Sequence, residues 1–178
     1  MTIISSQRLQ LVPLTPGALA ALMNRDSVAA EHVLGGRFPS PELVPPLMVD
    51  ALGFFLEIAS AGPESAAWGA RAYITTDTRE IVGMGGFTGP PDEHGNVTMG
   101  YSVFPECQRR GYASEAARAL AEWALSQPGV TRVQATISPR NVASERVAAY
   151  AGLHRTDAME DDPDEGPVVV WHRTQDLA

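Results

Sequence analysis

Apolar and polar side chains alternate in several short segments of the chain, and this two-residue period is typical of half-buried β-strands. In residues 8–14, for example, Leu9 and Leu11 fall on one side of an extended chain. Several of these segments are bounded by Gly, Pro, Asn or Asp residues that favour turns. The predicted strands are residues 8–14, 68–75, 81–88, 97–104, 132–137, 153–159 and 168–172.

Segments with the spacing of amphipathic helices lie between these strands. The clearest is residues 113–126, where Ala113, Ala117, Leu120 and Ala124 fall on one stripe. Further helices are predicted at residues 16–24, 47–59 and 142–151, with a short helix and a loop within 27–46. Early helices, an antiparallel run of strands and then strand–helix–strand–helix–strand predict a mixed α/β (α+β) fold.

The composition agrees with a single domain over residues 1–178. The chain has 178 residues, of which 44% are hydrophobic and 19% charged, so it can form one sizeable core. Its 13 basic residues, all arginines, face 21 acidic ones, which gives a net charge of −8. A phosphate backbone would be repelled by so acidic a protein, so we expect no nucleic-acid partner.

The sequence shows no membrane span, no export signal and no metal-binding pattern. No apolar stretch reaches the roughly 20 residues of a membrane span, and residues 1–13 do not resemble an export signal. We therefore expect a cytoplasmic protein without a membrane partner. Cys107 is the only cysteine, which excludes an internal disulfide. The four histidines show no metal-ligand spacing, so we expect no metal.

The segment between residues 97 and 126 carries the clearest chemistry. A predicted strand ends at Pro105, and a short loop leads through Gly111 into the strongest predicted helix. The N–H groups at such a helix start can hold an anion, and Arg109 and Arg110 add positive charge. Gly111 lets the backbone approach a bulky diphosphate, and Ala113 keeps the next turn small. From spacing alone, an ordinary helix start with solvated arginines explains the segment equally well.

Two motifs in order resemble those of the GNAT N-acetyltransferases. Gln-Arg-Arg-Gly-Tyr-Ala at 108–113, after Gly-Tyr-Ser-Val at 100–103, resembles the family's acetyl-CoA-binding motif. Asn-Val-Ala-Ser at 141–144, leading to Ala-Gly-Leu at 151–153, resembles its second motif. Together with Arg-Leu-Gln-Leu at 8–11, the second motif is most similar to the RimJ/RimL-like branch, whose members acetylate protein N-termini and some small amines.

The resemblance implies a fold and a set of ligand contacts. The fold would be a mostly antiparallel seven-stranded sheet, splayed between its fourth and fifth strands and flanked by about four helices. The pantetheine arm of acetyl-CoA would pair with backbone near Val103, whose N–H would stabilise charge on the thioester oxygen. The implied acetyl-CoA contacts are Phe104, Gln108, Arg109, Arg110, Gly111, Tyr112, Ala113, Ser114, Asn141 and Ser144. For Asn141, a helix N-cap is an equally good interpretation, and it could serve both roles.

The acid and the base are less clear, because two usual positions differ. Thr98 stands where many family members have a glutamate base, and Ala148 where many have a tyrosine acid. Tyr150 should face away, because two helical residues are roughly 200° apart. Ser144 shares a helix face with Ala148, and the branch resemblance makes it the candidate acid. A plain polar first-turn residue is the alternative.

The missing glutamate favours an acceptor that loses its proton easily. At pH 7 an α-amine needs about 1.4 kcal/mol to become neutral, whereas a lysine side chain needs about 4.6 kcal/mol. Glu93 and His94 are the nearest titratable candidates for a proton relay, with solvated loop residues as the plainer interpretation. The acidic turn could attract a cationic acceptor or be a solvated hairpin turn; it contains Asp161, Asp162, Asp164 and Glu165.

The expected function is therefore transfer of acetyl from acetyl-CoA to a primary amine, by direct attack of the amine. Two alternatives stay open: a non-catalytic acyl-CoA-binding module, and an interaction domain whose Gly111 turn holds another anion. The sequence does not set the oligomeric state, so a homodimer stays open as well.

Overall fold

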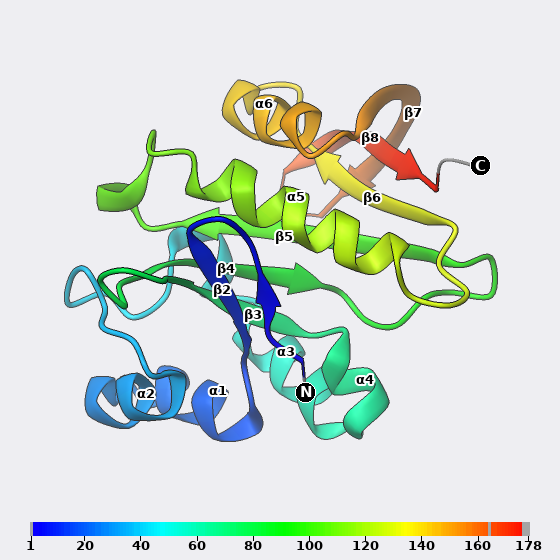
Figure 1. Cartoon of the computed structure of the whole chain (residues 1–178). Coiled ribbons are helices and arrows are strands. Elements are labelled where there is room, and N and C mark those ends of the chain that lie inside the picture. Colours follow the sequence, from blue (N-terminus) through cyan, green and yellow to red (C-terminus); the bar gives the residue numbers. More distant parts are fainter. Residues whose placement is uncertain (1, 164, 176–178) are drawn as a thin grey trace.

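The computed structural model describes residues 2–163 and 165–175, and this part of the chain forms an eight-stranded sheet with helices on both faces (Figure 1). The strand order is β1-β2-β3-β4-β5-β6-β8-β7. The strands are β1 (Ile4–Ser5), β2 (Leu9–Pro13), β3 (Ala70–Thr75), β4 (Ile81–Phe87), β5 (Asn96–Val103), β6 (Arg132–Ile137), β7 (His154–Asp162) and β8 (Gly166–Thr174).

Helices cover both faces of the sheet. In Figure 1, α5 and α6 lie together on one side of the strands, and α1 to α4 lie on the other. The α-helices are α1 (Pro16–Met23), α2 (Ser27–Leu34), α3 (Leu52–Ser60), α4 (Pro63–Ala67), α5 (Tyr112–Leu125) and α6 (Val142–Tyr150). Two short 3-10 helices, η1 (Pro46–Met48) and η2 (Pro105–Cys107), complete the elements of the described residues.

The predicted fold class is confirmed, and the differences in detail have simple causes. Within the described residues the sheet has eight strands instead of seven, because β1 adds a two-residue edge strand next to β2. Two residues are too few to show an alternating pattern. The predicted helix at 47–59 is in fact η1 followed by α3, which begins only at Leu52. The short α4 was not predicted at all, and the described chain has six α-helices where about four were expected.

Helix α5 packs an alanine-rich stripe onto the sheet. Ala116, Ala117, Leu120 and Ala124 are fully buried, as the sequence pattern predicts. Small side chains let the helix axis approach the strands closely, so that its N-terminus is held firmly beside the end of β5. The last turn is anchored by Trp123, whose ring lies 4.9 Å from that of Trp68.

The sheet opens between β5 and β6, the one parallel pair in the described sheet. The two strands pair only at Asn96–Arg132, Val97–Val133 and Thr98–Gln134. Beyond this point β5 stays paired with β4 as far as Val103, and β6 stays paired with β8 as far as Ile137. The facing edges of β5 and β6 therefore diverge, which confirms the predicted splay between these two strands.

Candidate active site

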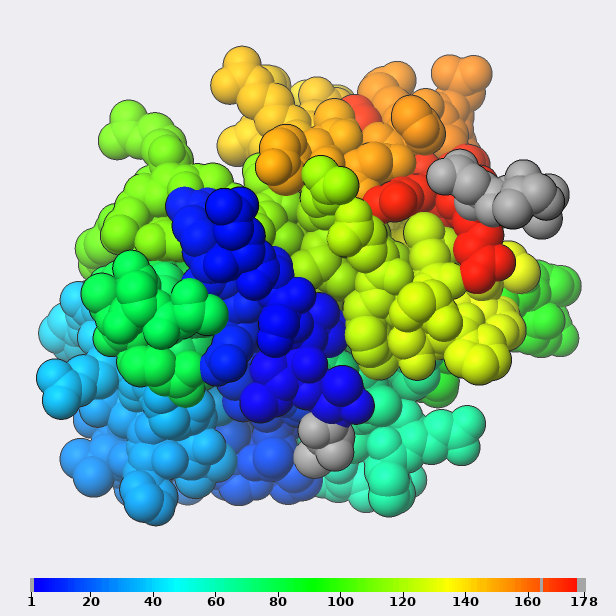
Figure 2. Space-filling model, in the orientation of Figure 1, coloured from blue at the N-terminus to red at the C-terminus, as the bar shows by residue number. Residues whose placement is uncertain are grey.

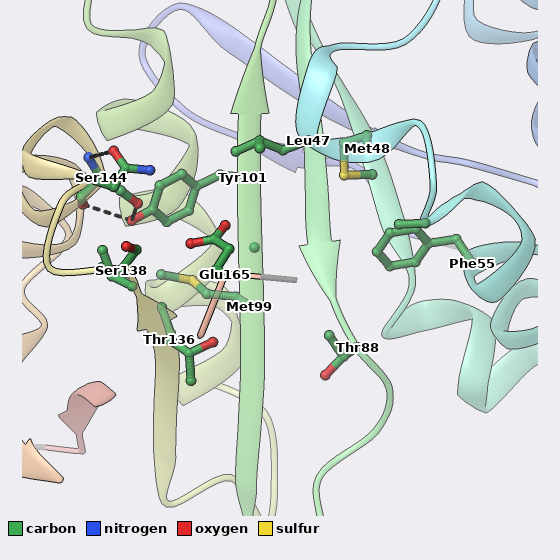
Figure 3. Close-up of a pocket in the computed structure, with 15 residues that line it drawn as sticks. Leu47, Met48, Phe55, Thr88, Met99, Tyr101, Thr136, Ser138, Ser144 and Glu165 are labelled. Carbon is green, nitrogen blue, oxygen red and sulfur yellow. Dashed lines mark hydrogen bonds between the residues drawn. The ribbon is translucent and has the colours of Figure 1, made fainter. Parts of the chain in front are cut away.

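A cavity of about 210 Å³ lies in the opening between β5 and β6 (Figure 3). One side is polar and comes from β6 and the start of α6. The other side is apolar and comes from η1 and α3. The lining residues are Leu47, Met48, Ala51, Phe55, Thr88, Met99, Gly100, Tyr101, Ala135, Thr136, Ile137, Ser138, Asn141, Ser144 and Glu165.

Strand β5 directs backbone N–H groups toward this opening. The Phe104 N–H donates to the Val82 carbonyl on β4, at 3.1 Å. Because successive N–H groups of a strand point to opposite edges, the N–H groups of Val103 and Tyr101 point toward β6, which has already diverged. Val103 thus has the donor orientation that the predicted contact with a thioester oxygen requires.

Phe104 lies in the core at the end of β5. Its ring is fully buried and packs edge-on against Phe38, with ring centroids 6.2 Å apart. Its N–H donates to the Val82 carbonyl and its carbonyl accepts from the Cys107 N–H, so Phe104 fixes the end of β5. Its contact with acetyl-CoA stays a prediction. A buried aromatic is not distinguishable from a ligand contact by sequence position alone.

The loop before α5 turns sharply into the helix. Gly111 is the N-cap in the left-handed conformation, with φ of 83°, and no side chain of the described residues caps the helix. Arg109 also has a positive φ of 59°, so two left-handed residues turn the chain sharply. The N–H groups of the first turn are therefore directed out of the helix end. Of the predicted contacts, Gln108, Arg109 and Arg110 are exposed, Ala113 and Ser114 are half-buried, and Tyr112 is buried.

Three hydrogen bonds fix the first turn of α5 to the N-terminal segment. The Glu115 carboxylate accepts from the Ser6 hydroxyl at 2.7 Å, from the Arg8 N–H at 2.6 Å and from Arg8 Nε at 2.7 Å. Burial raises the pKa of Glu115, but the bonds from Ser6 and Arg8 outweigh it and hold the pKa below its usual value. The contacts of Ser6 and Arg8 with Glu115 could not be predicted from the sequence, because no local pattern links residues that are more than 100 positions apart.

Arg8 also contacts the loop itself. Its Nη1 donates to the Arg110 carbonyl at 3.2 Å, and its guanidinium lies 4.8 Å above the Tyr112 ring. In Figure 2 the N-terminal segment, in dark blue, lies across the surface directly beside the green segment that contains the loop and α5. Cys107, just before the loop, is only 1% exposed, and burial raises the pKa of its thiol, which does not favour a nucleophile.

The start of α6 brings Asn141 and Ser144 to the cavity. The Asn141 Oδ1 accepts from the Ser144 N–H at 3.0 Å, so the N-cap interpretation of Asn141 is confirmed. Its contact with pantetheine stays a prediction. Ser144 Oγ lines the cavity and donates to the Tyr101 hydroxyl at 3.1 Å. Ala148 is fully buried, and Tyr150 is 60% exposed and outside the cavity, as expected.

The proposed relay residues do not reach this site. Glu93 and His94 are exposed, and the His94 carbonyl accepts from Thr131 Oγ1 at the closed end of the splay, where β6 begins. Thr98 is also outside the cavity, and its Oγ1 accepts from Gln134 Nε2 at 3.1 Å. None of the three can act directly on a molecule bound in the opening.

Glu165 brings a carboxylate to the cavity. It lies in the β7–β8 turn directly before β8, where its N–H donates to Asp162 Oδ1 at 2.9 Å, and it lines the cavity. The sequence predicts Glu165 in an acidic turn, but it contains no signal that this turn lies at the opening between β5 and β6. Asp164, of the same turn, lies outside the described residues.

Metal ligands and membrane-spanning helices were also sought among the described residues. Within residues 2–163 and 165–175, no three His, Cys, Asp or Glu side chains come together as a metal site would require. None of the helices in this same part of the chain has the length and apolar character needed to cross a bilayer.

Comparison with known proteins identifies the family of the chain. The sequence profile described as "Acetyltransferase (GNAT) domain" matches residues 8–154. The chain is similar to the uncharacterized N-acetyltransferase YjdG of Bacillus subtilis (strain 168), with 28% identity over 156 residues, which are 86% of this chain and 90% of YjdG.

Solved structures share the fold at low sequence identity. The ribosomal-protein-S5-alanine acetyltransferase of Vibrio fischeri superposes with a TM-score of 0.67 at 14% identity, covering 99% of this chain and 98% of that one. RimL, a ribosomal L7/L12 α-N-protein acetyltransferase determined in complex with coenzyme A, superposes with a TM-score of 0.65 at 18% identity, covering 97% and 98%.

Proposed function

Because the chain belongs to the GNAT acetyltransferase family, and so is an acyltransferase, we propose that it transfers acetyl from acetyl-CoA to a primary amine by direct attack. The acceptor would be a peptide α-amine or a small amine, as in the RimJ/RimL-like branch that the motifs at 8–11 and 141–144 resemble. The observation that carries this proposal is the divergence of β5 and β6 directly beside the uncapped N-terminus of α5.

The residues of the opening fit an extended thioester with two phosphates. Backbone N–H groups between Arg109 and Ser114 would hold the pyrophosphate, and the left-handed Gly111 leaves room for it. The free edge of β5 near Val103 would pair with the pantetheine amides in place of the missing strand. Asn141, at the opposite wall, lies where it could contact the same arm.

The chain's own groups match the charges that develop during transfer. The Val103 N–H would donate to the thioester oxygen, which becomes negative as the amine nitrogen forms its bond to the carbonyl carbon. When the C–S bond breaks, the Ser144 hydroxyl would give its proton to the sulfur. The amine loses one proton and the sulfur gains one, so the overall reaction is balanced.

The walls of the cavity support a cationic acceptor with an apolar neighbouring group. Glu165 would attract the ammonium form and accept its proton. Opposite it, Leu47, Met48 and Phe55 form an apolar wall, and Leu47 is 65% exposed. An α-amine needs less free energy for deprotonation than a lysine side chain, so we keep it as the preferred acceptor.

Thiol release with acetyl-CoA tests the proposal. The wild-type protein would be offered peptides with free N-termini, the same peptides with an acetylated N-terminus and an internal lysine, and small alkyl and aryl amines. We expect release of CoA with free N-termini or small amines, and faster release when an apolar group lies next to the amine. Binding of acetyl-CoA without release of CoA by any amine would instead indicate the non-catalytic module. Rapid acetylation of internal lysines alone would contradict the preferred acceptor.

A further inference from the structure

A second hydroxyl lies beside the proposed acid. Tyr101 extends from β5 across the opening to the first turn of α6 (Figure 3). Its hydroxyl oxygen lies 3.1 Å from Ser144 Oγ and 3.0 Å from the Ser144 carbonyl oxygen. This bridge connects β5 to α6 at the place where the thioester would react.

The two hydrogen bonds at the Tyr101 hydroxyl show which group donates in each. Ser144 Oγ donates to the Tyr101 oxygen, and Tyr101 donates to the Ser144 carbonyl. A sulfur atom in the opening would compete for the Ser144 proton. Once that proton turns to the sulfur, rotation about the Tyr101 Cζ–Oη bond redirects the phenol proton from the carbonyl to Ser144 Oγ. No heavy atom has to move, because both acceptors already lie within hydrogen-bond distance.

We propose that Tyr101 is a positioning residue for acetyl transfer, which holds the Ser144 hydroxyl at the opening and restores the proton that Ser144 gives up. The inference rests on the proposed function. In the step itself, the Ser144 O–H bond breaks as the S–H bond forms, and the Tyr101 O–H bond breaks as the Ser144 O–H bond is restored. Glu165, which accepts the proton that the amine releases, passes it through water to Tyr101, so that no net charge is left on Glu165, Ser144 or Tyr101.

The surroundings of Tyr101 suit this role. The side chain is half-buried, and burial raises the pKa of its hydroxyl more than the bond from Ser144 lowers it, so the group stays protonated at neutral pH. On α6 the corresponding helix face offers no proton, because Ala148 is a fully buried methyl group. The Tyr101 hydroxyl on β5 therefore supplies the proton donor that is absent at Ala148 of α6.

Steady-state kinetics of four variants of the full-length protein test the proposal. Tyr101→Phe keeps the ring and removes the hydroxyl, and Ser144→Ala removes the acid. The double variant tests whether the two act together, and Tyr150→Phe, on the exposed side of α6, is the matched control. The measurements are kcat, the KM for acetyl-CoA, the Kd for CoA and the thermal midpoint.

We expect Tyr101→Phe to lower kcat by about 10-fold or more, with KM for acetyl-CoA and Kd for CoA within about twofold of wild type. The double variant should be no slower than Ser144→Ala by more than about twofold, because the two hydroxyls act in one step. Tyr150→Phe should behave as wild type.

Three results would overturn the inference: unchanged kcat in Tyr101→Phe, a loss confined to CoA affinity and thermal stability, or multiplicative losses in the double variant. A wild-type protein that turns over no amine would be a different failure, that of the proposed function itself, and the role of Tyr101 would fall with it.

Discussion

Arg8 and Glu115 are 107 residues apart in the sequence, yet Arg8 Nε lies 2.7 Å from Glu115 Oε2. The same arginine donates to the Arg110 carbonyl, so one side chain contacts both the loop and the first turn of α5. The proposed phosphate site is therefore positioned by a segment that lies outside the motif itself. This contact explains how an exposed loop keeps two left-handed residues in place.

Replacing Arg8 by alanine should weaken CoA binding without contact between Arg8 and the pantetheine arm. We expect Kd for CoA to rise about five- to tenfold. The free energy of unfolding should fall by about 1 kcal/mol, because Arg8 loses its side-chain bonds to Glu115 and Arg110, and solvent screens both at a half-exposed side chain. Titration calorimetry and urea denaturation measure the two effects. Arg118→Ala is the control, because its i,i+4 pair with Glu122 is exposed to solvent and should contribute little to the free energy of unfolding. Equal effects of the two variants on CoA binding would contradict the positioning role.

Acidification should destabilise the protein partly through Glu115. Its pKa in the folded protein lies below its ordinary value, so the unfolded chain takes up the proton first and the contribution exists above the unfolded pKa of about 4.3. That contribution is lost as the pH falls through the lower, folded pKa. Denaturation midpoints measured between neutral pH and pH 3 should therefore fall less steeply for Glu115→Gln than for wild type. Parallel curves for the two proteins would show that the carboxylate has no such linkage.

The conformation of Gly111 predicts the effect of adding one methyl group. With φ of 83°, alanine at this position is strained, and its Cβ would lie 3.3 Å from Arg8 Nη2. We expect Gly111→Ala to lower the free energy of unfolding by about 1 kcal/mol and to weaken CoA binding. Gly53→Ala, inside α3 with no atom within 4 Å of the new Cβ, should instead raise the free energy of unfolding by about 0.5–1 kcal/mol. An unchanged affinity for CoA in Gly111→Ala would remove this turn from the phosphate site.

Gly85 tests how tightly β5 must be held against β4. A Cβ there would come too close to both the Gly100 carbonyl and the Tyr73 hydroxyl. Gly85→Ala should push β5 away from β4 and lower the free energy of unfolding by about 1–3 kcal/mol, with loss of acetyl transfer in the remaining folded protein. In Gly17→Ala, near the start of α1, the new Cβ lies 3.9 Å from Thr15 Oγ1, its nearest neighbour. This control variant should keep both its free energy of unfolding and its acetyl transfer. Circular dichroism during thermal unfolding measures the difference.

The parts of the fold that have a local signal were predictable, and the site was only partly so. The splay, the α5 stripe and the Gly111 turn follow from periodicity and from motifs that resemble a family. The contacts of Glu115 and Glu165 do not, because each depends on which distant segment the sheet brings next to it. Phe104 was expected as an acetyl-CoA contact from the resemblance, and the structure shows that it is also a core residue, which its position in the sequence does not indicate. The register of the strands and the position of the β7–β8 turn depend on the whole sheet, so no short segment of the sequence determines them.

Glu165 provides the most direct test of how the acceptor is bound. Glu165→Gln keeps the size of the side chain but removes its charge, so the cavity loses both its attraction for an ammonium group and its proton acceptor. We expect kcat/KM for the amine to fall about 10- to 100-fold, while KM for acetyl-CoA stays within about twofold. Glu160→Gln, on the exposed strand β7, changes the net charge by the same amount and serves as the control. Long-range steering by the acidic surface would lower the amine's kcat/KM equally in both variants and would be screened by salt, whereas a local contact makes only Glu165→Gln defective at every ionic strength. A Glu165→Gln protein with wild-type kcat/KM would exclude this carboxylate from acceptor binding and from deprotonation of the amine.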